Sequence, residues 1–126
     1  MNEKDNKFSI VKRGQSFTHA WRGIGVCLKS THNAWIHIVI FLFAIFLGIF
    51  FHITKIEWLF VLLASGFVFT AETFNTAIEI DIDLTSPDHH PFARDTKDVS
   101  AGAVLISAIT AFIIGAIIFI PYLYNF

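Results

Sequence analysis

One stretch of the chain, residues 70–83, carries side chains suited to binding a metal ion and moving a proton. On a helix of about 100° per residue its polar members share one face. They are Glu72, Asn75, Thr76, Glu79 and Asp83. The opposite face is apolar apart from Asp81. Carboxylates aligned in this way repel one another and are costly to desolvate, and a bound metal ion is the simplest compensation.

The same stretch continues an apolar run, residues 58–69, within one expected helix. A helix needs about 20 residues to cross the hydrocarbon of a bilayer. The crossing part therefore reaches to about Ile78, and Glu72 and Asn75 lie at the membrane edge. Carboxylates at such a depth are candidates for function. The alternative is that both side chains only bond neighbouring helices.

The composition indicates a small integral membrane protein with a single domain. Apolar residues make up 55% of the chain and charged residues 15%, which is too apolar for an ordinary soluble domain. The net charge of −1 gives no case for nucleic acid binding. We expect a polar cytoplasmic tail over residues 1–13 and one membrane domain over residues 14–126. The single cysteine, Cys27, excludes an internal disulfide.

The hydrophobic pattern predicts an all-α fold of four helices. An amphipathic helix over residues 15–30 is too short and too charged to cross, so we expect it on the membrane surface, although it could instead pack on the protein. Three membrane-spanning helices follow. Their expected ranges are 34–53, 57–83 with a cytoplasmic extension, and 91–120 with a cytoplasmic start, ended by Pro121. His37, near one end of the first span, is interpreted as an interfacial histidine rather than as a ligand.

The positive charges predict the orientation. The N-terminal segment before the first span carries six of the nine Lys and Arg residues, and the connection around Arg94 and Lys97 carries two more. Cytoplasmic loops are enriched in these residues. Three spans with a cytoplasmic N-terminus therefore place eight of the nine on that side, together with the polar residues 79–98.

The polar residues around the second connection are suited to phosphoryl transfer. Seven of the ten acidic residues lie between Glu72 and Asp98, close to Lys97. Mg²⁺ usually takes one or two carboxylates plus phosphate oxygens, and a lysine can neutralise the transferred phosphate. A more deeply placed Glu72 could accept a proton from a lipid hydroxyl. No Walker-type Gly-x-x-x-x-Gly-Lys segment is present, and an ion-translocating helix would show similar carboxylates.

Three segments make the chain resemble the prokaryotic diacylglycerol kinase family. They are Glu72-Thr-Phe-Asn75-Thr-Ala-Ile-Glu79, Ser86-Pro-Asp-His-His90-Pro and Lys97-Asp98-Val-Ser-Ala-Gly-Ala103. The resemblance covers residues 16–121. It implies a homotrimer of small bacterial inner-membrane subunits with composite active sites at the cytoplasmic interface. The implied reaction is ATP- and Mg²⁺-dependent phosphorylation of a lipid alcohol, either diacylglycerol or undecaprenol.

The resemblance also implies roles for individual residues. Glu72 matches the general base, and Asn75 matches a polar residue that holds the site in shape. Glu79 matches a glutamate that binds metal at the ATP phosphates, and Lys97 with Asp98 matches the nucleotide-contacting pair. Four further residues are expected near the nucleotide: Asp83, Asp88, His89 and His90.

The chain departs from the family before the first span. Where the family carries a second metal-binding glutamate in a Glu-x-Asn-x-Arg-Ile-His pattern, this chain has Thr31, and Trp35 replaces the arginine. A neutral hydroxyl is a weaker Mg²⁺ ligand than a carboxylate. This departure leaves open a catalytically weakened family member with a structural role. An ion or solute transport subunit is a second alternative, because it would also place carboxylates in a membrane helix.

Overall fold

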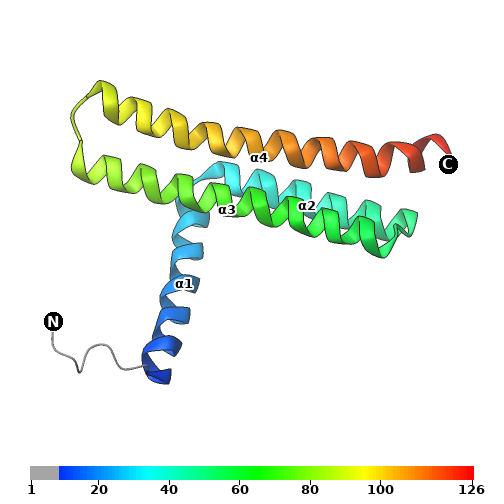
Figure 1. Ribbon diagram of the computed structural model, residues 1–126, viewed down its shortest axis with the longest axis horizontal. Coiled ribbons are helices and arrows are strands. Elements are labelled where there is room, and N and C mark those ends of the chain that lie inside the picture. The colour runs from blue at the N-terminus through cyan, green and yellow to red at the C-terminus, as the bar shows by residue number, and fades with distance from the viewer. Residues whose placement is uncertain (1–8) are drawn as a thin grey trace.

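The computed structural model describes residues 9–126 and is all α-helical over them. The four helices are α1 (Ile10–Ser30), α2 (His32–Phe51), α3 (Lys55–Thr85) and α4 (Pro91–Tyr124). Figure 1 shows α2, α3 and α4 lying side by side, while α1 leaves the start of α2 at a steep angle. The first eight residues of the expected polar tail lie outside the described residues.

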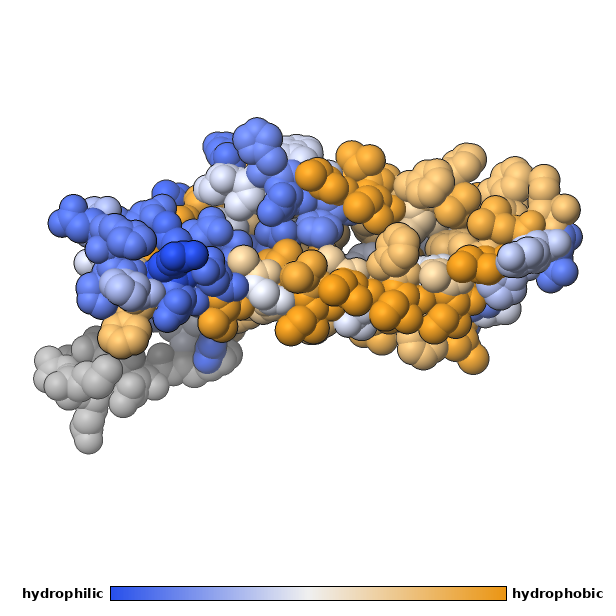
Figure 2. Space-filling model, turned by 90° about the horizontal axis from the view of Figure 1, so that it is seen from above, coloured by the Kyte–Doolittle hydropathy of each residue, from blue (hydrophilic) through white to orange (hydrophobic). Residues whose placement is uncertain are grey.

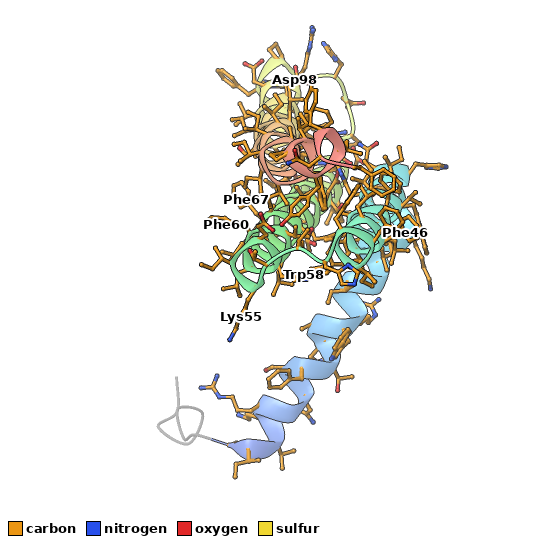
Figure 3. All side chains as sticks on the ribbon, turned by 90° about the vertical axis from the view of Figure 1, so that its right-hand side faces the viewer. Phe46, Lys55, Trp58, Phe60, Phe67 and Asp98 are labelled. Carbon is orange, nitrogen blue, oxygen red and sulfur yellow. The ribbon has the colours of Figure 1, made fainter. Side chains whose placement is uncertain are left out.

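Three of these helices are long and apolar enough to cross a membrane. They are α2, α3 and α4, and few of the residues in their most apolar segments are buried inside the chain. Hydrophilic side chains gather at the end where α3 joins α4, and apolar side chains cover most of the remaining length (Figure 2). The exposed Phe60 and Phe67 project from α3 away from α2 (Figure 3). Such surfaces need lipid or protein around them.

α1 begins five residues earlier than the amphipathic pattern predicts. Ser9 is its N-cap and accepts a hydrogen bond from the backbone N–H of Lys12. Serine is favoured at this position because its hydroxyl satisfies an N–H that has no partner within the helix. A cap at Ser9 therefore carries the helix through residues 10–14, which the apolar spacing alone does not mark.

The bend between α1 and α2 is fixed by Thr31. This residue has extended backbone angles, and its N–H donates to the Cys27 carbonyl oxygen at 3.2 Å. Its hydroxyl oxygen accepts from the Ala34 N–H at 3.3 Å, so Thr31 also caps α2. The indole N–H of Trp35 adds a 2.8 Å bond to the Leu28 carbonyl oxygen. Both departures from the family pattern thus hold the two helices in register.

The turn between α2 and α3 is equally well defined. His52 adopts the left-handed conformation, with φ 53° and ψ 52°, and the Ile53 N–H donates to the Gly48 carbonyl oxygen. Thr54 and Glu57 then form a capping box at the start of α3. The Trp58 indole lies against Gly48, where a Cβ would be only 2.5 Å from Trp58 Cη2.

The hydrophobic core lies at this end, opposite the polar end. Its buried members are Ile53, Val61, Ile118 and Phe119, contributed by α3, α4 and the turn before α3. The Tyr122 hydroxyl donates a 2.7 Å hydrogen bond to Glu57, which fixes the end of α4 to the start of α3. Because α3 and α4 are clamped here, their polar ends are brought into register across the length of both helices.

The expectation that Pro121 ends the last helix is wrong. α4 continues through Pro121 to Tyr124, and the Asn125 N–H still donates to the Pro121 carbonyl oxygen. Proline lacks the N–H that would bond one turn back, but its φ is compatible with a helix. Within one turn of the helix end, only a single backbone bond is lost, so the helix continues.

Candidate active site

Glu72 is the most buried acidic group in the described part of the chain. Its side chain is 1% exposed, and His37 of α2 approaches it, with Nε2 3.1 Å from Oε1. This contact lies within hydrogen-bond distance but is not aligned as one, and no other donor among residues 9–126 reaches either carboxylate oxygen. The result is a carboxylate inside the protein that no described donor binds.

One turn further along α3, Asn75 connects two helices. Its Nδ2 donates to Glu79 Oε1 at 3.0 Å, and its Oδ1 accepts from the Ser100 hydroxyl of α4 at 2.7 Å. Asn75 and Ser100 are both buried, whereas Glu79 is half-buried. This chain of hydrogen bonds fixes one oxygen of Glu79 and leaves the other available to a ligand.

Thr76 anchors α1 beside the same turn of α3. Its hydroxyl donates to the Glu72 carbonyl oxygen at 2.9 Å, and the Cys27 sulfur lies 3.4 Å from the same hydroxyl oxygen. Because the hydroxyl proton is already used, the Cys27 thiol is the donor in this contact. The end of α1 therefore lies at the level of Glu72 along α3.

The charged residues near the α3–α4 loop form ion pairs. Lys97 pairs with Asp83 across the two helices, and Arg94 pairs with Asp98 one turn apart on α4, at 3.8 Å. These side chains are 39–72% exposed, so solvent screens both pairs and their net stabilisation is small. Lys97 and Asp98 are therefore accessible, but each already has a partner.

An open depression of about 450 Å³ lies at this end of the molecule. Its lining includes six of the charged or histidine side chains near the loop: Asp83, Asp88, His89, His90, Lys97 and Asp98. His90 is also the N-cap of α4, because its Nδ1 accepts from the Phe92 N–H at 3.2 Å. The loop residues thus line the same depression as Lys97 and Asp98.

A second, apolar groove of about 560 Å³ runs between α1, α2 and α3. Its lining includes Leu28, Ile38, Phe69 and Thr73. Phe69 and Thr73 flank Glu72 on α3, and Ile38 follows His37 on α2. The groove therefore lies at the level of Glu72 along α3, although Glu72 itself does not line it.

The described residues contain no group of three or more His, Cys, Asp or Glu side chains that could hold a metal ion. Thr31 is half-buried, and its hydroxyl oxygen caps α2. Glu79 is the expected carboxylate ligand with an oxygen free of the Asn75 bond. One carboxylate, with water and phosphate oxygens completing the shell, is compatible with how Mg²⁺ is commonly bound.

Sequence reasoning missed two contacts at this site. Ser100 was not singled out, although it lies three residues after Lys97 and therefore on a neighbouring part of the α4 surface. His37 was interpreted as an interfacial histidine, whereas it contacts Glu72. A histidine on the first span and a carboxylate on the second were the only signals, and neither fixes how the helices cross.

Three membrane-length helices and a cluster of acidic and basic groups at one end define a small multi-pass membrane protein. A sequence model of the family described as prokaryotic diacylglycerol kinase matches residues 18–119. The chain therefore belongs to that family, whose members are lipid kinases, and the resemblance inferred from its motifs is confirmed.

The relatives include proteins named for two different lipids. Undecaprenol kinase of Bacillus subtilis (strain 168) is 37% identical over 98% of this chain and 100% of its own length. Diacylglycerol kinase of Synechocystis sp. (strain ATCC 27184 / PCC 6803 / Kazusa) is 35% identical over 84% of this chain and 61% of its own length. Diacylglycerol kinase of Helicobacter pylori (strain ATCC 700392 / 26695) is 25% identical over 81% of this chain.

Proposed function

We propose that the chain transfers the γ-phosphate of ATP to the hydroxyl of a membrane lipid alcohol, undecaprenol or diacylglycerol. The observation that carries this proposal is the order of polar groups along α3. Glu72 is 1% exposed and Asn75 7%, whereas Glu79 is half-buried and Asp83 is exposed. At 1.5 Å per residue, Glu72 and Glu79 are roughly 10 Å apart along the axis. A lipid hydroxyl and a nucleotide phosphate could approach from opposite ends of this series.

In this reaction Glu72 is the general base. It accepts the hydroxyl proton as the lipid oxygen forms a bond to the γ-phosphorus and the bond to the β–γ bridging oxygen breaks. Lys97 neutralises charge on the phosphate, which requires it to exchange Asp83 for the nucleotide. Asp98 and the loop residues Asp88, His89 and His90 contact the nucleotide in the depression that they line.

Asn75 and Glu79 supply the place for a metal ion. The Asn75 amide donates to one oxygen of Glu79 and so holds the carboxylate in place. Its second oxygen can then bind a metal ion. When bound there, Mg²⁺ would neutralise phosphate charge. Thr31 offers only a neutral oxygen that already accepts the Ala34 N–H, so Glu79 carries most of the binding.

The apolar groove supports a lipid acceptor. It lies between α1, α2 and α3 at the level of Glu72 along α3, where a hydrocarbon chain would be shielded from water. Nearly full-length similarity to an undecaprenol kinase makes undecaprenol the first lipid to test. Family membership favours a kinase over the transport-subunit alternative.

We further infer a homotrimer in the bacterial cytoplasmic membrane, with the N-terminus and the polar end in the cytoplasm. The uneven distribution of Lys and Arg supports the orientation. The exposed apolar side chains along α2, α3 and α4 fit a protein surrounded by lipid, and the resemblance to the family implies the trimer. Composite sites would allow a second copy to add metal ligands that residues 9–126 of one chain do not bring together.

A direct assay tests the proposed function. The protein, purified in detergent with Mg²⁺ and ATP labelled in the γ-phosphate, is offered diacylglycerol and undecaprenol in parallel. Label should appear in one lipid with the parent chain, and the rate should fall by about 10²–10⁴-fold with Glu72→Gln, which keeps the shape of the side chain but removes the base. Absence of transfer to either lipid by a folded protein would refute the proposal. Omitting Mg²⁺ and replacing ATP by other nucleotides test the two cofactors separately.

A further inference from the structure

The burial of Glu72 raises the question of what holds its carboxylate in place. Each of its oxygens has less than 1 Å² exposed, and neither makes an aligned hydrogen bond to any residue in the range 9–126. A buried polar group without a partner is costly, and a carboxylate more so. A general base must also present one defined lone pair to its substrate. Some neighbouring group must therefore orient this side chain.

His37 is the polar side chain in contact with it. Its Nε2 lies 3.1 Å from Glu72 Oε1, and the imidazole is 18% exposed. The backbone that carries His37 is also fixed, because Thr31 caps α2 and the Trp35 indole bonds α2 to α1. Catalytic hydrogen bonds are often poorly aligned before substrate binds and tighten in the complex. A modest rotation of either ring or carboxylate would direct Nε2–H toward Oε1.

We propose that His37 is a positioning residue for Glu72, an inference that rests on the proposed function. Nε2–H donates to Oε1 and holds the carboxylate so that Oε2 faces the lipid hydroxyl. The proton balance is unchanged by this bond: the hydroxyl proton passes to Oε2 as the oxygen–phosphorus bond forms and the β–γ bridging bond breaks. His37 gains and loses no proton and contacts no reacting atom.

Two variants of His37 separate orientation from packing. His37→Leu keeps much of the volume but removes the donor, and it should lower kcat about tenfold or more with the KM for ATP unchanged. His37→Gln offers an amide N–H at a similar reach and should recover most of the rate. His52→Asn, at the far end of α2 and tolerant of the left-handed conformation, is the control and should match the parent. Thermal unfolding of each variant in detergent checks that the fold is retained.

Non-additivity supplies a second kinetic test. If His37 acts through Glu72, then adding His37→Leu to Glu72→Gln should lower the residual rate no further. Unchanged kcat in His37→Leu, equal losses in the Leu and Gln variants, or an additional loss in the double variant would each overturn the proposal.

A spectroscopic measurement reports the contact without requiring activity. In protein with ¹⁵N-labelled histidine reconstituted in lipid, the His37 ring resonances, assigned by their loss in His37→Gln, should shift in Glu72→Gln and stay in place in Ser107→Ala. A resonance indifferent to Glu72→Gln would overturn the proposal. If the ring signal shifts but the parent chain phosphorylates neither lipid, the proposed function fails while the His37–Glu72 contact stands.

Discussion

At the scale of single residues, the candidate site depends on side chains that direct other side chains. Ser100, on α4, bonds to Asn75 of α3, and Asn75 bonds in turn to Glu79. None of these bonds involves a substrate, yet together they decide which oxygen of Glu79 is free. Removing the Ser100 hydroxyl should therefore change the orientation of the Glu79 carboxylate.

Ser100→Ala tests this dependence. The substitution leaves Asn75 Oδ1 without its donor, at a cost of about 1 kcal/mol in stability, and allows the Asn75 amide to turn away from Glu79. We expect kcat/KM for ATP to fall several-fold and the Mg²⁺ concentration for half-maximal rate to rise. The matched control is Ser107→Ala, because buried Ser107 donates only within its own helix, to the Val104 carbonyl oxygen. Equal kinetics for the two variants would contradict the proposed role.

Thr31→Glu tests the departure from the family pattern. A second carboxylate should lower the Mg²⁺ concentration needed for half-maximal rate, since charge strengthens binding of a hard cation. Thr31 also caps α2, so the change should cost up to about 1 kcal/mol of stability. Thr31→Ala removes the cap without adding charge and should reproduce only that stability loss. An unchanged Mg²⁺ requirement in Thr31→Glu would argue against a metal-binding role for this position.

At the scale of helices, the turn between α2 and α3 sets how closely the two helices pack. The Trp58 indole occupies the space that a side chain at position 48 would need. His52 reverses the chain there in the left-handed conformation, and the capping box of Thr54 and Glu57 starts α3 immediately afterwards. Little room remains for the indole to move without disturbing Ile53 in the core.

Gly48→Ala should consequently destabilise the fold. The new Cβ would lie 2.5 Å from Trp58 Cη2 and 3.1 Å from Ile53 Cδ1, so the indole must shift, at a cost of about 1–3 kcal/mol. Thermal unfolding in detergent measures the effect. Gly23→Ala in α1, where a Cβ would meet nothing within 4 Å, is the control and should be neutral or slightly stabilising. A stable Gly48→Ala protein would show that this contact does not limit packing.

At the scale of the whole molecule, the sequence predicted the helices better than it predicted the side-chain contacts between them. Three membrane-length helices follow from apolar runs, and family membership follows from the motifs around Glu72 and Lys97. The start of α1 was missed because Ser9 marks it by capping rather than by apolar spacing. The His37–Glu72 contact joins residues 35 positions apart, and the Asn75–Ser100 contact joins residues 25 positions apart. Each pair lies on two different helices, so the contacts depend on how the helices cross, which the spacing of apolar residues does not predict.

The proposed orientation can be tested with single cysteines. In a Cys27→Ser background, Ser86→Cys in the α3–α4 loop should react with a membrane-impermeant maleimide only from the cytoplasmic side. Asn125→Cys, beyond α4, should react only from the opposite side. Intact cells and inverted membrane vesicles provide the two exposures, and detergent-solubilised protein shows that both thiols can react. The reverse pattern would refute a cytoplasmic polar end.

The contact between α1 and α3 defines a fixed length of α3, from its start at Lys55 to Glu72. Cys27 and Thr76 hold the end of α1 at the level of Glu72, and the capping box fixes α3 at Lys55. The intervening rise is about 26 Å at 1.5 Å per residue, close to the roughly 30 Å of a bilayer's hydrocarbon. If α1 lies on the membrane surface, as its sequence predicts, this length of α3 would place Glu72 at headgroup depth. Thinner or thicker bilayers would then displace this base from the lipid hydroxyls, and the rate of phosphorylation would report the match between protein and membrane.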